Sequence, residues 1–203
     1  MHIAEGVLSG PVLAAGFAIT GVGVGIGLKK IDFEHIAETG MMAAAFFVAS
    51  LVHVPVGPAN VHLILNGLVG LLLGWAAFPA IATALLLQAV FFQFGGFTSL
   101  GVNTAIMALP AVACHYLFAP LINKSPKVSA GAAFACGFTA VMFGASLLGG
   151  ALFLSDENFL EVASIAVSAH IPVMIIEGFI TLFCIGFLKK VRPEMLQGKE
   201  NRP

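Results

Sequence analysis

Charged side chains are scarce in this chain. Asp, Glu, Lys and Arg together make up 9% of its 203 residues, whereas hydrophobic residues make up 59%. Soluble domains carry about 25% charged residues, so the composition excludes a water-soluble globular protein. Three long stretches contain no charged residue at all: residues 6–28, 39–123 and 128–155. Because a helix needs about 20 apolar residues to cross a bilayer, we expect several membrane spans.

Signatures of several other functions are missing as well. The sequence has no basic stripe of the kind that binds a nucleic-acid backbone, since its nine Lys and Arg residues fall in three short clusters. The three cysteines, Cys114, Cys136 and Cys184, lie singly in apolar runs without C-x-x-C spacing. We interpret them as small core residues.

Glycines four residues apart occur inside the apolar runs. No strand precedes them and no G-K-[ST] sequence follows, which argues against a nucleotide-binding loop. Such pairs allow two helices to approach closely in lipid. The pairs are Gly21/Gly25, Gly23/Gly27 and Gly70/Gly74.

The apolar runs predict an all-α membrane protein, a bundle of about seven transmembrane helices. Two of the predicted spans, the second and the third, are short for a full crossing. The predicted spans are residues 10–28, 39–54, 60–75, 77–93, 103–122, 128–153 and 160–188.

The link between the second and third spans reads "HVPVGPAN" and is broken by Pro55, Gly57 and Pro58. Non-helical backbone at membrane depth is tolerated only where protein or a water-filled cavity covers it. We therefore predict a binding loop here, with His62 opening the helix that follows.

The basic residues predict the orientation, because Lys and Arg gather in cytoplasmic loops. Their three clusters follow the first, fifth and seventh predicted helices, which places all of them on one side. The N-terminus is therefore expected outside and the C-terminus in the cytoplasm. We expect one transmembrane metal-binding domain over residues 1–190 and a polar cytoplasmic tail over residues 191–203.

This orientation brings four loops together on the outer face. They contain His, Asn and Gly-rich backbone but no positive charge, which suits a site for a small cation. The loops are "MHIAEG" at the N-terminus, "HVPVGPANVH", "FGGFTSLGVN" at 94–103 and "SDEN" at 155–158.

The N-terminus itself offers metal ligands. The first 28 residues contain no Lys or Arg, so we expect no cleaved signal peptide and a retained Met1 with a free α-amine. That amine, the amide nitrogen of His2 and its imidazole Nδ1 can form adjacent chelate rings in one plane. A fourth nitrogen, from His53 or His62, would complete a square typical of Ni(II) or Cu(II), with Co(II) possible.

Other polar residues have competing interpretations. Asn103 is predicted to support the metal-binding loop by hydrogen bonds, with helix capping as the alternative. Glu5 is expected either to balance the charge of the cation or simply to be hydrated. His170 and Glu177 share one face of the last helix, and we interpret them as packing or partner-coupling residues. His115 is expected to form hydrogen bonds within the bundle.

Four motifs together resemble the CbiM/NikM family, the substrate-capture subunits of energy-coupling-factor (ECF) importers for cobalt and nickel. The resemblance extends over residues 1 to about 190, and the motifs occur in the order that the family shows. They are "MHIAEG", "VHLILNGLVGLLLG" at 61–74, "GGFTSLGVN" at 95–103 and "HIPVMIIEGFIT" at 170–181.

The resemblance implies a seven-helix protein in a bacterial or archaeal cell membrane that captures Co(II) or Ni(II) for ATP-driven uptake. It implies Met1, His2 and His62 as the metal ligands. It also implies partners: a transmembrane T subunit (CbiQ/NikQ-like), cytoplasmic ATPases (CbiO/NikO-like) and often a small accessory membrane subunit (CbiN/NikN-like). The imported metal would serve cobalamin biosynthesis or nickel enzymes. The choice between cobalt and nickel remains open.

The sequence argues against two other classes of function, a metalloenzyme and a channel. A membrane-embedded metalloenzyme would need an H-E-x-x-H pair or a nucleophile constellation, and neither occurs. A channel would need a polar lining through the bilayer, and the predicted spans are too apolar for one. We therefore expect no enzymatic activity in this chain and no bound nucleotide.

Overall fold

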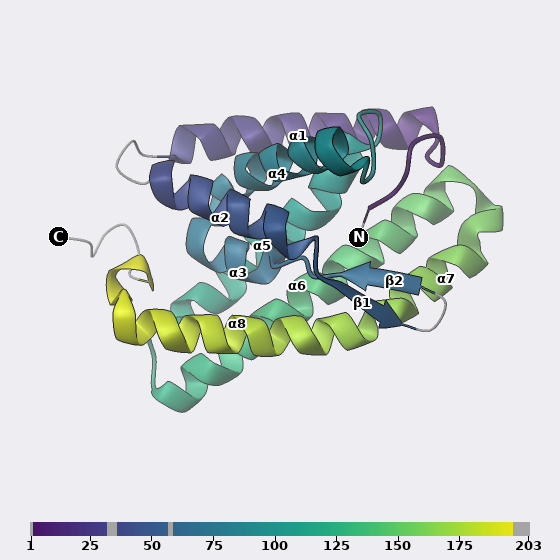
Figure 1. Cartoon of the computed structure of the whole chain (residues 1–203). Coiled ribbons are helices and arrows are strands. Elements are labelled where there is room, and N and C mark those ends of the chain that lie inside the picture. Colours follow the sequence, from purple (N-terminus) through teal and green to yellow (C-terminus); the bar gives the residue numbers. More distant parts are fainter. Residues whose placement is uncertain (1, 32–35, 57–58, 197–203) are drawn as a thin grey trace.

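The computed structural model describes residues 2–31, 36–56 and 59–196 and shows a helical bundle with one short β-hairpin (Figure 1). The helical fold class predicted from the sequence is confirmed. The helices are α1 (Gly10–Lys30), α2 (Ile36–Ala49), α3 (Asn66–Leu73), α4 (Ala77–Phe92), α5 (Leu100–Ile122), α6 (Pro126–Ser155), α7 (Leu160–Ala169) and α8 (Ile171–Val191). Short 3-10 turns are η2 (Gly74–Ala76), η3 (Glu157–Phe159) and η4 (Pro193–Leu196), and the hairpin is β1 (His53–Val56) with β2 (Ala59–His62).

Among the residues that the structure describes, five helical segments are long and apolar enough to cross a membrane, and α2 is shorter. The five are Gly10–Lys30, Asn66–Phe92, Leu100–Ile122, Pro126–Ser155 and Glu157–Val191. The segment Asn66–Phe92 joins the later part of the third predicted span to nearly all of the fourth, and the two parts meet at the η2 turn.

The core lies around α3, α5 and α6. α6 packs against both α5 and α8, and α5 packs against α1, α3 and α4. In Figure 1, α1 and α8 lie on opposite sides of the bundle, with α5 and α6 between them. Six of the eight residues of α3 are buried, so this short helix is enclosed by protein, which makes its short length tolerable in a membrane.

Some of the glycine pairs predicted from the sequence lie at close helix contacts in this chain, and others do not. A Cβ atom on Gly23 would lie 2.4 Å from the Phe78 ring, and one on Gly70 would lie 2.1 Å from the Ala111 carbonyl oxygen. A Cβ atom on Gly21 or Gly25 would meet nothing within 4 Å. Of the two offset pairs in α1, the pair formed by Gly23 and Gly27 is therefore the one that packs against α4 and η2 within this chain.

Two predicted helices differ from the structure. Residues 60–65 are not helical: the backbone of 59–62 pairs with 53–56 as an antiparallel hairpin, and α3 begins at Asn66. His62 therefore ends a strand instead of opening a helix. The prolines at 55 and 58 and the β-branched valines of this stretch disfavour a helix and favour strands.

The last predicted span, residues 160–188, is divided at His170. α7 ends at Ala169 and α8 begins at Ile171, with Pro172 in its first turn. Proline lacks the N–H that would continue a helix but is well suited to the start of a new one.

Candidate metal-binding site

The segment before α1 runs from the start of that helix inward toward the hairpin (Figure 1). Its Ile3 side chain is 4% exposed and belongs to the hydrophobic core. Asn103 in the first turn of α5 holds its main chain at two points: Oδ1 accepts from Ile3 N at 2.9 Å, and Nδ2 donates to Ile3 O at 3.0 Å. Met1 lies outside the described residues.

Two further contacts fix the same segment to the end of the bundle. The Glu5 carboxylate accepts a hydrogen bond from Thr98 N at 3.1 Å, and Ser9 N donates to Ser155 Oγ at 3.2 Å. Glu5 therefore attaches the segment to the α4–α5 loop. The Asn103 side chain holds the N-terminal segment, and its role in metal binding stays a prediction.

The fold brings His2 and His62 together although they are 60 positions apart in the sequence. His62 Nε2 lies 2.8 Å from His2 Nδ1, and the ring centroids are 4.7 Å apart. Burial lowers the pKa of His2 to about 3 and that of His62 to about 2. Both rings are therefore neutral at physiological pH, the state in which imidazole binds a metal.

The outer nitrogen of each ring has a hydrogen-bond partner. His62 Nδ1 lies 2.8 Å from the Leu63 carbonyl oxygen, and His2 Nε2 lies 2.8 Å from the side-chain amide of Gln88. A carbonyl oxygen only accepts hydrogen bonds, so His62 Nδ1 carries the proton and His62 Nε2 keeps its lone pair. That lone pair faces His2 Nδ1. A cation between the two nitrogens would have one imidazole ligand from each ring.

His53 occupies a different position. It is the cross-strand neighbour of His62 in the hairpin, its ring is exposed, and the two ring centroids are 6.1 Å apart. Its Nδ1 donates to the Leu51 carbonyl oxygen at 3.0 Å. The structure therefore places His62, and not His53, directly beside His2.

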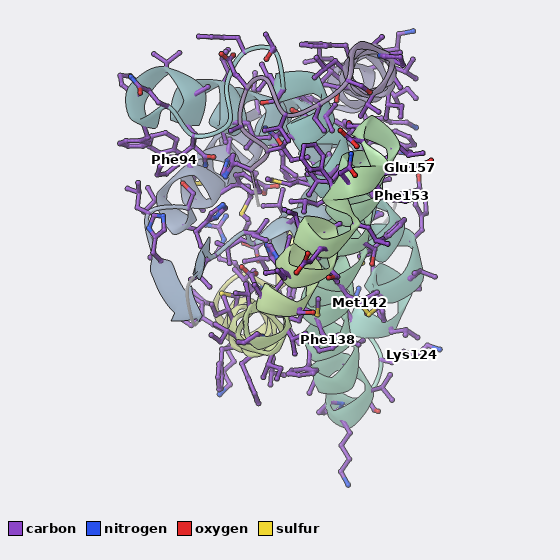
Figure 2. All side chains as sticks on the ribbon, turned by 90° about the vertical axis from the view of Figure 1, so that its right-hand side faces the viewer. Phe94, Lys124, Phe138, Met142, Phe153 and Glu157 are labelled. Atoms are coloured by element: carbon purple, nitrogen blue, oxygen red, sulfur yellow. The ribbon has the colours of Figure 1, made fainter. Side chains whose placement is uncertain are left out.

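The aromatic ring of Phe94 lies beside His2. Phe94, from the α4–α5 connection, lies with its ring centroid 5.8 Å from that of His2 and 5.9 Å from that of His53. Figure 2 looks onto this end of the bundle, with Phe94 labelled on the same side as the hairpin. Within the described ranges, no three His, Cys, Asp or Glu side chains form a metal-binding group. A metal held here would need main-chain nitrogens as further ligands.

Gln88 was not recognised from the sequence. It is fully buried in α4, and its Nε2 has no hydrogen-bond partner among the described residues. The available signal was a single amide side chain in the run "ALLLQAVFF", because a buried polar residue in an apolar span is a functional candidate.

Glu177, which the sequence analysis interprets as a packing or partner-coupling residue, contacts the segment that follows the hairpin. Its carboxyl oxygens accept hydrogen bonds from Ile64 N and Leu65 N, just after β2. The reason is that residues 63–65 enter the bundle as coil rather than helix. His170 is buried with Nδ1 2.7 Å from the Ala166 oxygen. His115 contacts the carbonyls of α3, as expected for a residue hydrogen-bonded within the bundle.

Comparison with known proteins identifies relatives over nearly the whole chain. The family model described as CbiM, "Cobalt uptake substrate-specific transmembrane region", matches residues 2–195. A putative metal transport protein of Haemophilus influenzae is 43% identical, with 99% of both chains covered. The cobalt transport protein CbiM of Sorangium cellulosum is 32% identical over 97% of this chain and 94% of its own.

A fused nickel transport protein NikMN of Rhodobacter capsulatus is 31% identical, and the match spans 97% of this chain and 64% of that protein. Among solved structures, the crystal structure of a transition metal transporter has a TM-score of 0.72 and 27% identity, and covers 94% of this chain and 93% of that one. A truncated transition metal transporter gives the same TM-score at 26% identity. This chain belongs to the CbiM family.

Proposed function

We propose that this chain captures Co(II) or Ni(II) at the outer face of a bacterial or archaeal cell membrane for uptake. The ligands are the Met1 amine, the amide nitrogen and Nδ1 of His2, and Nε2 of His62. The observation that carries the proposal is the 2.8 Å separation of His62 Nε2 and His2 Nδ1, with the proton of His62 held on Nδ1 by the Leu63 carbonyl so that the lone pair of Nε2 faces His2. The transport function named for several relatives supports it.

The distance also supports a square coordination geometry. A metal about 2.0 Å from each of two nitrogens at a right angle separates them by about 2.8 Å, whereas a tetrahedral angle separates them by about 3.3 Å. Square-planar nitrogen coordination is typical of Ni(II) and Cu(II). A plane filled by four protein nitrogens leaves no in-plane position for a substrate, which favours capture over catalysis.

The proposed topology has seven crossings, with the N-terminus outside and the C-terminus in the cytoplasm. The last turns of α1 and α8 carry Lys29 with Lys30 and Lys189 with Lys190. These two helix ends lie at the end of the bundle opposite the hairpin (Figure 1). Residues 1–190 form the transmembrane metal-binding domain, and residues 191–203 form the cytoplasmic tail.

Energy for transport must come from partners, because the sequence contains no nucleotide-binding motif. We propose an ECF-type importer with a CbiQ/NikQ-like transmembrane subunit and CbiO/NikO-like ATPases. The fused NikMN relatives support a CbiN/NikN-like accessory partner, since the M and N parts are fused in those proteins.

Titration of the purified chain with Ni(II) and Co(II), followed by visible absorption, tests the proposal. We expect one ion per chain in the unaltered protein and a loss of at least a hundredfold in affinity in His62→Ala, which removes one of the four ligands. His53→Ala, on the paired strand position, is the matched control and should retain binding. Equal losses in the two variants would contradict the assignment of His62.

A further inference from the structure

A buried acidic side chain lies below the hairpin, in the middle of an apolar helix. Glu177 in α8 is 0% exposed, and both of its carboxyl oxygens point at one short stretch of main chain. Oε1 accepts from Ile64 N and from Leu65 N, the latter at 2.9 Å, and Oε2 accepts from Leu65 N at 3.0 Å. Such a group is costly in a membrane and usually has a function.

The backbone that Glu177 holds has an unusual conformation. Leu65 adopts the left-handed region with φ 59° and ψ 13°, which is uncommon for a residue with a side chain. Leu65 is the N-cap residue of α3, which begins at Asn66, and its side chain makes no capping hydrogen bond. The carboxyl group of Glu177 therefore serves as the acceptor for the N–H groups at this turn.

One planar peptide unit connects this carboxyl group to His62. The peptide between Leu63 and Ile64 presents its carbonyl oxygen to His62 Nδ1 at 2.8 Å and its N–H to Glu177 Oε1. Because a peptide bond is rigid and planar, fixing its N–H also fixes the direction of its carbonyl. An acceptor on the N–H also polarises the unit and strengthens the carbonyl as an acceptor.

We propose that Glu177 is a positioning residue for metal capture, which sets the tautomer and orientation of His62 through the Leu63–Ile64 peptide. Metal-binding histidines commonly donate their other N–H to a carboxylate or a carbonyl, and loss of that partner typically costs 10–100-fold in metal affinity. Here the carboxyl group and the imidazole are joined by an intervening peptide. The inference rests on the proposed function, because it assigns His62 as a ligand.

A double-mutant cycle tests this inference. Glu177→Gln replaces one of the two acceptor oxygens by an NH2 group, which cannot accept a hydrogen bond from the main-chain N–H groups of Ile64 and Leu65. We expect it to lower Ni(II) affinity about tenfold and to shift the visible band of the bound metal toward that of His62→Ala. In the His62→Ala background the same change should cost less than about twofold, since residues that act through one contact are not additive. An equal loss in both backgrounds would overturn the proposal.

Thr181→Val is the matched control, because Thr181 is also fully buried in α8, one turn further along, and its hydroxyl has no hydrogen-bond partner among the described residues. It should leave the affinity unchanged. If Glu177→Gln does not fold, nitrogen NMR of the histidine rings in the unaltered, metal-free chain still decides. A protonated Nδ1 and a bare Nε2 on His62 support the proposal, whereas the opposite tautomer contradicts it.

The failure of this inference is distinguishable from failure of the proposed function. A chain that binds no metal, or that binds it equally well without His62, contradicts the proposed function. A chain that needs His62 but is insensitive to Glu177→Gln contradicts this inference alone.

Discussion

Asn103 pairs with the main chain of Ile3 on both its donor and its acceptor side, across 100 positions of sequence. All three hydrogen bonds of the Asn103 amide are buried, since Nδ2 also donates to Ser99 Oγ at 3.1 Å. The Asn103 amide pairs with the N–H and the carbonyl of Ile3, as the backbone of a neighbouring strand would. These bonds hold the segment that contains His2 close to the hairpin.

Removal of this clamp should weaken metal binding without disrupting the bundle. Asn103→Leu leaves the buried N–H and carbonyl of Ile3 without partners, which costs about 1–3 kcal/mol. If that cost opposes closure of the N-terminal segment, Ni(II) affinity falls by about 10–100-fold. Isothermal titration of the purified variant measures it. Glu5→Gln, at an exposed contact of the same segment, is the control, and a larger loss there than in Asn103→Leu would contradict this account.

Gln88 should matter because a metal on His2 Nδ1 leaves the proton of the ring on Nε2, where the Gln88 amide oxygen can accept it. Gln88→Leu removes the acceptor for Nε2–H, so the ring is free to place its proton on Nδ1, and we expect about a tenfold weaker metal affinity. Gln88→Glu, which still accepts from Nε2–H, should retain binding. Gln93→Asn, beyond the end of α4, is a control. Equal binding by the leucine and glutamate variants would show that this hydrogen bond has no role.

The glycines of α1 should differ in their effect on stability. Gly23→Ala places a methyl group 2.4 Å from the Phe78 ring and should lower the free energy of unfolding by about 1–3 kcal/mol. Gly25→Ala, where nothing lies within 4 Å, should not. Unfolding in mixed micelles with increasing dodecyl sulfate compares the two. Similar losses would mean that α1 does not pack on α4 as described.

The orientation can be tested in intact cells with a maleimide that does not cross membranes. In a Cys184→Ser background, with Cys114 and Cys136 buried, Asn158→Cys in η3 should be labelled from outside. Lys127→Cys at the start of α6 should be labelled only after the cells are permeabilised. The reverse pattern would place the histidine pair on the cytoplasmic side and exclude outer-face capture.

The apolar runs were sufficient to predict the helical bundle, because long stretches without charge have few alternatives in a membrane. The hairpin was missed because strand pairing of His53 with His62 depends on the partner strand, which hydropathy does not reveal. Pro172 is a local indication that a new helix begins after His170, because proline favours the first turn of a helix.

The candidate site could be predicted only in part. His2, His62 and Asn103 were identified from the outer loops and from the family motifs. Gln88 and the contacts of Glu177 were not, since they join residues 86 and 113 positions apart and depend on how α4 and α8 pack. Hydrogen bonds of this kind become visible only when the helices are assembled.

The central claim is that the α-amine of Met1 completes the metal site formed by His2 and His62. A version with a cleavable extension ahead of Met1, designed so that cleavage leaves Met1 with a free α-amine, tests it by Ni(II) titration before and after cleavage. We predict a loss of at least a hundredfold in affinity while the amine is an amide, and full recovery after cleavage. Equal affinity before and after cleavage would contradict the account.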